Sequence, residues 1–574
     1  MRRTQLAGII ILFIVALYLA VVIVPEDHPL GNYRIKATID INGEKVNVEL
    51  ITRLAENDGM LIQNTTTYTI GEFNYSLNIM GLDSYARRVG NKFWAYVRLT
   101  IENRTINISS EQVSGEILGP DTKSETMNII GENGRIRLEK TIRVNVRFAF
   151  YVFLFIIVIW AIFALNPLII ALAVPVLAIL VVNIPPYDVL SVFWDPAIAL
   201  IFGAFVIAYS MDKSGLAKRL SYIIVSKAKS PRKLLFYMAF TSFFLSMWMS
   251  SLATMLVMLP IISTILKAFN ASEKSGYAQG ITLATIFGSV LGGMTTLVGN
   301  PANALAASIA YRTLGARVEF IDWIMYALPL SIMIMIVVIM ILAIIYDIKK
   351  DIREQLIRFD ETSFLAFEAH LMGMGPLTRD EKITLLVLVS VIVSWIISSI
   401  LSSMGYVCYL NLSAISLAGA LVLMATNVFT TDDLKEIRWD VLLVLGGSLS
   451  LAVLMKESGI LDIFMVELMA LSLVKIIVLI IPMLIVLSLI LGALVSIAII
   501  LPLLQYSLIL NPGFLIYMTL ISTAIIFGPN GVVLEEHARG RGFLRYSSFV
   551  KMSIVYMVIA LALLIPSAFI FVLL

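Results

Sequence analysis

The feature that most constrains this chain is a series of apolar runs, each about as long as a lipid bilayer is thick. From residue 147 onward one such run follows another, and charged residues fall mostly between the runs. A bilayer core takes about 20 helical residues to cross. Backbone polar groups in lipid must be hydrogen-bonded internally, which a single helical segment achieves by itself. The sequence therefore predicts a polytopic α-helical membrane protein.

The charges divide the chain into two kinds of sequence. Of the 122 residues from 25 to 146, 30 are charged, the share usual in soluble domains, against 51 of the other 452 residues. The single cysteine, Cys408, excludes a disulfide framework, and three histidines argue against a zinc cluster. A net charge of +3 gives no indication of a nucleic-acid partner. We assign no catalytic or metal-ligating residue and do not expect an enzyme.

The N-terminal part contains one apolar run and one polar region. The run 5–24 is assigned to a first transmembrane helix within residues 1–29, and Arg2 and Arg3 before it favour a cytoplasmic N-terminus. Residues 30–146 alternate polar and apolar in short runs separated by Asn-Gly and Asp-Gly turns, which is typical of β-strands. This pattern predicts an extracytoplasmic, β-sandwich-like domain.

The rest of the chain is predicted to form two transmembrane repeats, 147–347 and 381–574, joined by a cytoplasmic linker at 348–380. Its length and composition favour a multi-pass protein of the cell membrane, surrounded by lipid. The predicted apolar spans are 147–165, 167–184, 196–212, 234–268, 277–311, 322–347, 381–402, 411–427, 439–456, 476–508, 514–534 and 551–573.

The positive charges assign the two sides of the membrane. The three Lys/Arg-rich segments are 213–233, 348–382 and 535–551, and the two loops without Lys or Arg are 185–195 and 403–410. The positive-inside rule places the basic segments in the cytoplasm and the β-rich region outside. This assignment requires that 234–268 and 476–508 each enter and leave on one side, as re-entrant hairpins.

Three landmarks indicate that the two halves are related. They are Trp194-Asp195, which recurs as Trp439-Asp440; Lys213-Ser214-Gly215-Leu216, which recurs as Glu457-Ser458-Gly459-Ile460; and Leu259-Pro260, which recurs as Leu501-Pro502. The offsets are nearly constant, at 245, 244 and 242 residues. With the charge-based sidedness, they predict inverted repeats, which place a substrate site near the membrane midplane between interrupted helices.

Uncharged polar residues, Gly and Pro interrupt the apolar runs at four places. The interrupting residues that we assign to substrate binding are Ser250, Ser251, Thr254, Thr296, Asn303, Ser496, Pro529 and Asn530. Irregular backbone at membrane depth is tolerated where it lines protein or a cavity. Helix-end N–H groups there suit an anion, and free carbonyls suit a cation. For Gly292 and Gly293, close helix packing by small residues is the alternative interpretation.

These interruptions resemble motifs of the ion transporter superfamily, which includes divalent-anion:sodium symporters, citrate permeases and arsenite permeases. Residues 248–261 resemble the family's first hairpin tip, and residues 292–303 match its Gly-Gly-x-x-Thr-x-x-Gly-x-Pro-x-Asn break at every named position. Trp439 to Gly459 resembles the ninth-helix region. The variant at Gly299-Asn300-Pro301 is more similar to the arsenite permeases. The resemblance covers about residues 150–574.

The resemblance implies two hairpin tips and two broken helices around one substrate, with flanking sodium ions, in a homodimer. Both hairpin-tip Asn residues are replaced in this chain, the first by Ser251, while Gly492 and Ala493 stand where the second tip has Ser-Asn. One cation site therefore remains in the prediction, at Ser250, Ser251, Gly299 and Asn300. Sodium is the expected coupling ion, and a proton-coupled or uncoupled mechanism stays open.

The sequence thus predicts a secondary active transporter that carries a small inorganic or carboxylate anion by alternating access. A sodium/proton antiporter or an arsenite permease is the alternative within the same class. Asp195, Asp212, Asp440 and Glu457 all lie near span ends, which weakens the antiporter alternative. A membrane-anchored cell-surface binding protein or receptor, acting through the β-rich region, is the alternative of another class.

Overall fold

The structure is a computed structural model of the chain. The residues that it describes are 31–41, 44–57, 60–70, 79–89, 92–101, 104–109, 113–114, 125–131, 134–141, 146–162, 167–182, 184–269, 271, 275–314, 317–346, 372–404, 411–458, 460–461, 473–504, 512–527, 534, 538, 540 and 542–573. The predicted first transmembrane helix (1–29), the predicted linker up to residue 371, and Cys408 lie outside the described residues.

The chain divides into two compact units. The first comprises Met1–Val158, Val176–Val189 and Val453–Val466 and contains all the described strands. The second comprises Ile159–Pro175, Leu190–Ala452 and Glu467–Leu574 and contains most of the helices. The helical unit holds the predicted site.

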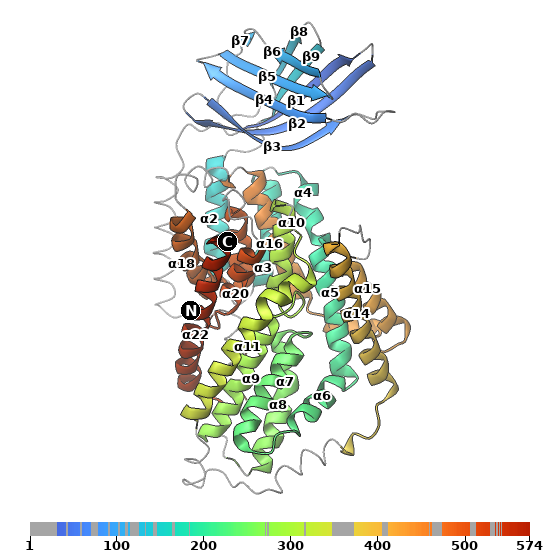
Figure 1. Ribbon diagram of the computed structural model, residues 1–574, viewed down its shortest axis with the longest axis vertical. Helices are drawn as coiled ribbons and strands as arrows, with labels where there is room; N and C mark the ends of the chain where they lie inside the picture. Colours follow the sequence, from blue (N-terminus) through green and yellow to red (C-terminus); the bar gives the residue numbers. More distant parts are fainter. Residues whose placement is uncertain are drawn as a thin grey trace. The chain divides into compact units, whose positions relative to one another are not determined.

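The described strands of the first unit pair in one antiparallel sheet with the order β6-β5-β4-β3-β2-β1-β9-β8, and β7 pairs with β5 (Figure 1). The strands are β1 (Gly31–Ile41), β2 (Glu44–Asn57), β3 (Met60–Ile70), β4 (Ile79–Val89), β5 (Lys92–Ile101), β6 (Arg104–Ser109), β7 (Val113–Ser114), β8 (Glu125–Gly131) and β9 (Gly134–Thr141). Most neighbours in the sheet are consecutive in sequence, as expected for strands joined by tight turns.

Along the main strand order, the junction between β3 and β4 has the fewest residue pairs. Two residue pairs join β3 to β4, whereas ten pairs join β2 to β3 and ten join β4 to β5. The described strands are thus continuous in hydrogen bonding but nearly divided at this point. A sandwich of two packed layers stays a prediction.

Most of the described helices fall on the predicted apolar spans, whereas α4, η1, α6 and η3 lie between the spans (Figure 1). In chain order, the described helices are α2 (Val146–Ile162), α3 (Pro167–Leu180), α4 (Pro186–Leu190), η1 (Ser191–Trp194), α5 (Pro196–Lys213), α6 (Leu216–Val225), α7 (Pro231–Ser246), α8 (Ser251–Ala268), α9 (Gly276–Met294), α10 (Pro301–Leu314), α11 (Phe320–Ile345), α14 (Arg379–Ser403), α15 (Leu412–Ala425), η3 (Thr431–Glu436), α16 (Trp439–Glu457), α18 (Leu473–Leu491), α19 (Ala493–Leu503), α20 (Pro512–Thr523) and α22 (Tyr546–Leu573).

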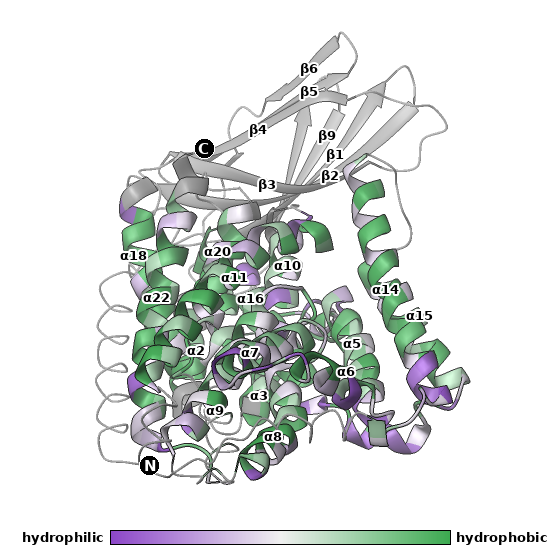
Figure 2. Ribbon diagram, turned by 60° about the horizontal axis from the view of Figure 1, so that its bottom comes forward, coloured by the Kyte–Doolittle hydropathy of each residue, from purple (hydrophilic) through white to green (hydrophobic). Residues whose placement is uncertain are grey.

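Six helical segments within the described part of the chain are long and apolar enough to cross a membrane. They are Pro186–Lys213, Ser251–Ala268, Phe320–Ile345, Arg379–Ser403, Trp439–Glu457 and Tyr546–Phe569. Figure 2 shows hydrophobic residues along most of the helices, with hydrophilic residues gathered around α6. The prediction of a multi-pass helical membrane protein is therefore confirmed.

Two glycines on one face of α9 allow α7 to approach it at backbone distance. A Cβ added to Gly288 would lie 2.3 Å from the carbonyl oxygen of Ala239, and one added to Gly292 would lie 2.0 Å from that of Phe243. The spacing of four residues puts both glycines on the same side of α9. Gly292 therefore packs helix against helix, as the alternative interpretation of this glycine predicted.

A buried ion pair joins α6 to α14. The guanidinium of Arg219 contacts the carboxylate of Glu381 at 2.7 Å, and both side chains are buried. Arg219 also donates hydrogen bonds to the carbonyl oxygens of Met374 and Gly375 at 3.1 and 2.8 Å. The remaining N–H groups of the buried guanidinium are thus directed to carbonyl oxygens, as burial of a charge requires.

Candidate functional site

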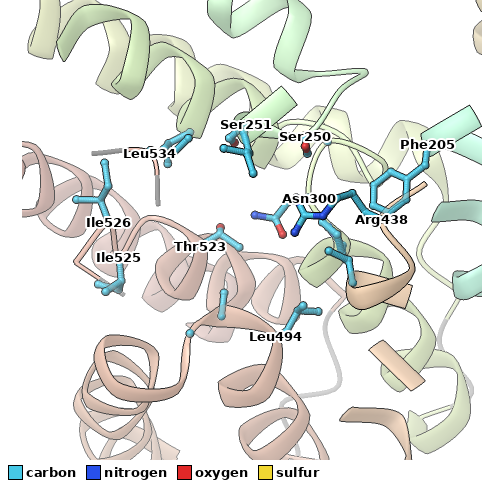
Figure 3. Close-up of a pocket in the computed structure, with 17 residues that line it drawn as sticks. Phe205, Ser250, Ser251, Asn300, Arg438, Leu494, Thr523, Ile525, Ile526 and Leu534 are labelled. Atoms are coloured by element: carbon cyan, nitrogen blue, oxygen red, sulfur yellow. The ribbon is translucent and has the colours of Figure 1, made fainter. Parts of the chain in front are cut away.

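One cavity in the helical unit is lined by residues from both two-helix hairpins, α7–α8 and α18–α19, and from the chain after α9 and after α20 (Figure 3). Its volume is about 170 Å³. An engineered cavity of about 150 Å³ holds one benzene molecule, so this space suits a solute of a few heavy atoms. The lining residues are Phe205, Ser250, Ser251, Leu252, Val290, Gly299, Asn300, Pro301, Arg438, Val441, Gly492, Ala493, Leu494, Thr523, Ile525, Ile526 and Leu534.

The tip of the first hairpin places two serines at the cavity. Ser250 caps α8, because its hydroxyl oxygen accepts a hydrogen bond from the backbone N–H of Ala253 at 3.3 Å. The Ser251 hydroxyl donates to the carbonyl oxygen of Ser289 on α9 at 3.0 Å. Both serines are therefore held in place by neighbouring backbone, at the N-terminus of α8.

The break between α9 and α10 is fastened to this tip. The Thr296 hydroxyl donates to the carbonyl oxygen of Met247 at 2.6 Å and accepts from the N–H of Gly299 at 3.0 Å. The side-chain oxygen of Asn300 accepts from the N–H of Ala302 at 3.0 Å, which caps α10. Gly299 and Asn300 line the cavity, whereas the fully buried Thr296 lies behind them.

Asn303 holds the break from behind. Its fully buried amide nitrogen donates to the carbonyl oxygens of Gly293 and Thr296 at 3.0 and 2.7 Å. Its side-chain oxygen has no hydrogen-bond partner among the described residues, and the hydroxyl of buried Thr254 has none there either. Neither residue lines the cavity. Buried polar atoms are usually paired, and these two belong to a small group of described buried atoms that are not.

The space beside Gly293 is bordered by oxygen atoms. A Cβ added to Gly293 would lie 3.0 Å from Ser251 Oγ, 3.1 Å from the carbonyl oxygen of Gly299 and 3.3 Å from Ser246 Oγ. A Cβ would crowd all three oxygens, so glycine lets them lie close to the backbone of α9. Hydroxyl and carbonyl oxygens are the ligands that hard cations prefer. Ser246 was missed in the sequence, because it is the last residue of α7 and stands before the turn.

The tip of the second hairpin is built differently. Gly492 alone turns α18 into α19, with φ of 81° and ψ of 168°, a conformation that is essentially restricted to glycine. Gly492, Ala493 and Leu494 line the cavity without a side-chain hydroxyl or amide. The hydroxyl of Ser496 donates to the carbonyl oxygen of Gly492 at 2.7 Å, so it lies within its own helix, fully buried and away from the lining.

The chain after α20 completes the lining. Thr523 lies at the end of α20, and its hydroxyl donates to the carbonyl oxygen of Thr519 at 2.9 Å. Ile525 and Ile526 follow and add apolar surface. The predicted site residues Pro529 and Asn530 lie outside the described residues.

Arg438 is the charged residue of the lining, and the sequence analysis did not select it. Its Nε and Nη2 donate to the two carboxylate oxygens of Asp440 at 2.9 and 2.8 Å. Figure 3 shows its side chain reaching toward Asn300, with Phe205 beside it. The sequence does carry one signal, a difference between the two predicted repeats: Phe193 stands before Trp194, whereas Arg438 stands before Trp439.

The lining combines helix N-termini with a fixed cation. The first residues of α8, α10 and α19 line the cavity, and Arg438 directly precedes α16. Each helix N-terminus carries about half a positive charge and free N–H groups, which favour an anion. The structure therefore brings together Ser250, Ser251, Gly299 and Asn300, whereas Thr254, Thr296, Asn303 and Ser496 lie behind the lining.

Comparison with known proteins gives consistent results. The family described as "Sodium:sulfate symporter transmembrane region" matches residues 136–573. An uncharacterized transporter of Haemophilus influenzae is 30% identical over 315 residues, which is 53% of this chain and 64% of that protein. An uncharacterized transporter of Methanocaldococcus jannaschii is 27% identical over 299 residues, or 52% of this chain and 63% of that protein.

A sodium-dependent dicarboxylate transporter of Staphylococcus saprophyticus is similar at a lower level, 25% identical over 300 residues, which is 48% of this chain and 56% of that protein. The matched stretches thus span less than two thirds of these relatives' own lengths.

Proposed function

The chain belongs to the family of the sodium:sulfate symporter transmembrane region, the divalent-anion:sodium symporters, and on this basis we propose that it is a secondary active transporter for a small oxyanion. The observation that carries the proposal is the cavity at which three helix N-termini meet the guanidinium of Arg438. These groups attract negative charge, and the volume of about 170 Å³ admits a small inorganic or carboxylate anion.

Sodium is the proposed coupling ion. One relative is named a sodium-dependent dicarboxylate transporter. In this chain, Ser251 Oγ, Ser246 Oγ and the Gly299 carbonyl oxygen border the space beside Gly293, and Ser250 and Asn300 lie at the same tip and break. A cation bound there would add positive charge next to the cavity, so that cation and anion each favour binding of the other.

Six further predicted residues are proposed to support the bound solute indirectly, by holding the backbone around it. They are Thr254, Thr296, Asn303 and Ser496, together with Pro529 and Asn530 of the second break. The hydroxyl of Thr296 fastens the first break to the carbonyl oxygen of Met247 at the hairpin tip, and the amide of Asn303 holds the carbonyl oxygens of Gly293 and Thr296. Binding sites need such supporting contacts to keep their geometry.

The transport cycle is proposed to be alternating access between inverted repeats in a homodimer. The order of elements supports the repeats, because α5, the α7–α8 hairpin and α9 are followed in the second half by α16, the α18–α19 hairpin and α20. The proposed orientation, from the positive-inside rule, has a cytoplasmic N-terminus and an external β-rich region.

The function is tested by reconstituting the full chain in liposomes and measuring uptake of sulfate, phosphate, arsenite, citrate and succinate under sodium or proton gradients. We expect accumulation of at least one oxyanion under an inward sodium gradient. Arsenite is largely uncharged near pH 7, so a positive cavity should not favour it. If no anion crosses under either gradient and the isolated β-rich region retains all binding, the transporter assignment is wrong.

A further inference from the structure

Arg438 has one edge of its guanidinium occupied and another edge free. The guanidinium carries five N–H donors in a planar fork. Nε and Nη2 each use one N–H on Asp440, at 2.9 and 2.8 Å. Nη1 has no hydrogen-bond partner within the described residues. The edge formed by Nη1 and the second N–H of Nη2 is therefore open, and the side chain is 45% exposed although it lines a cavity.

The position of Arg438 is electrostatically unfavourable without an anion. The residue directly precedes α16, where the helix dipole places partial positive charge. Asp440, in the first turn of α16, offsets part of this cost. The N-termini of α8, α10 and α19 at the same cavity add further positive potential. A second anionic partner is thus favoured at the free edge.

At the position that corresponds to Arg438, the first half of the chain carries a phenylalanine. Phe193 stands before Trp194 where Arg438 stands before Trp439, and a Cβ added to Gly446 would lie 2.4 Å from the Phe193 ring. Asp195, which corresponds to Asp440, is buried and receives hydrogen bonds from Ser308 and Arg312 at 2.9 and 2.6 Å. That arginine does not line the cavity. Among the described residues that line the cavity, the guanidinium therefore comes from the second half.

We propose that Arg438 binds the transported oxyanion directly through its Nη1–Nη2 edge, while Asp440 positions the guanidinium through the opposite edge. The inference rests on the proposed function and names the chemistry of its substrate, an anion with two oxygens that fit a guanidinium fork, such as a carboxylate or sulfate. Arg438 also supplies a fixed positive charge at the half of the cavity where the second hairpin tip, Gly492 to Leu494, has no side-chain oxygen for a cation.

The test compares KM and kcat for uptake of sulfate and succinate by liposomes containing the wild-type chain, Arg438→Gln, Arg438→Lys and the control Arg312→Gln. Arg438→Gln should raise KM about tenfold or more, since a hydrogen bond to a charged group is lost. The KM of Arg438→Lys should lie between those of the wild type and Arg438→Gln, because lysine keeps the charge but lacks the planar fork of N–H donors. Arg312→Gln should reduce the amount of folded protein but leave KM unchanged.

Two outcomes would overturn the inference. In one, Arg438→Gln and Arg312→Gln change KM equally. In the other, Arg438→Gln transports with the wild-type KM. Where Arg438→Gln does not fold, Arg438→Lys decides, because a wild-type KM in that variant contradicts recognition by the fork. If the wild-type chain takes up another oxyanion of the uptake panel but neither sulfate nor succinate, that oxyanion replaces them as the probe. If it takes up no oxyanion at all, the proposed function itself is contradicted.

Discussion

The two ends of the cavity that come from the first and second halves of the chain use different chemistry. The first hairpin tip and break present serine hydroxyls, carbonyl oxygens and an asparagine, held by a network that includes Thr296 and Asn303. The second tip presents Gly492, Ala493 and Leu494, and the charge on that side comes from Arg438. The two halves that are proposed to be repeats thus present different groups to the cavity, oxygen atoms from the first and a guanidinium from the second.

The largest effect is expected in the first half, for Asn303→Ala. The substitution removes the buried donor from two carbonyl oxygens, at a cost of about 1–3 kcal/mol each, and frees the backbone of the break. Uptake should fall about 100-fold or more, while size-exclusion chromatography shows that the protein still inserts and folds. Wild-type uptake in this variant would remove the first break from the transport site.

The next effect concerns the space beside Gly293. In Gly293→Ala the new methyl group would lie 3.0 Å from Ser251 Oγ and 3.1 Å from the Gly299 carbonyl oxygen, so it crowds the oxygens that are proposed to hold the cation. We expect a folded protein whose half-saturating sodium concentration rises about tenfold, measured by sodium-dependent uptake.

The adjacent residue, Gly292, provides a contrast to Gly293. In Gly292→Ala the methyl group would lie 2.0 Å from the Phe243 carbonyl oxygen, which backbone cannot relieve, so the yield of folded protein should fall. Unchanged sodium dependence in Gly293→Ala would place the cation elsewhere.

A smaller effect is expected at the second tip. Gly492→Ala forces a side chain into a backbone conformation with φ of 81°, at about 1–3 kcal/mol. The melting temperature should fall by a few degrees, and the half-saturating sodium concentration should stay near the wild-type value. A large loss of sodium affinity would show that both tips hold cations.

The smallest effect concerns a link between the halves, from Lys213 on α5 to Asp433 on η3. Burial acts to raise the pKa of Asp433, but hydrogen bonds from Lys213 and Thr430 and the lysine charge hold that pKa at about 2. A carboxyl with a lowered pKa stabilises the fold above its unfolded pKa of about 3.9, and this contribution is lost only as the pH falls toward 2.

The contribution of Asp433 should therefore be constant from pH 5 to pH 8. Because Lys213 is 37% exposed, solvent screens the pair, and Asp433→Asn should lower stability by about 1 kcal/mol or less. Thermal unfolding at several pH values measures the difference between wild type and variant. A difference that grows between pH 5 and pH 8 would contradict the assignment.

Much of the helical architecture could be predicted from the sequence. Each span can be recognised by its apolar side chains, because lipid surrounds it. The predicted spans 196–212 and 381–402 end within a few residues of the ends of α5 and α14. The first break was found because Gly, Pro and Asn together cannot continue a helix in lipid. The α7–α8 hairpin was predicted from the number of spans between the basic segments 213–233 and 348–382, because both segments are assigned to the same side of the membrane.

What the sequence could not give is which residues meet across the fold. Arg438 lies at the start of a predicted span, where a charge is normally solvated, and only the cavity distinguishes it from other interfacial arginines. Thr296 and Ser496 are alike as sequence signals, yet one bonds the hairpin tip and the other its own helix. Hydrogen-bond direction depends on side-chain orientation, which spacing alone does not fix.

The glycine contacts between α7 and α9 have a thermodynamic consequence for the proposed cycle. Gly288 and Gly292 bring the two backbones together with no side chain between them, so that Ser251, at the end of the hairpin, and Gly299, beyond α9, belong to one stiff block. A site built on such a block keeps the same intrinsic ion affinity wherever the block moves. In the proposed cycle, the electrochemical gradients of the transported ions, which include the membrane potential, then set the direction of net flux.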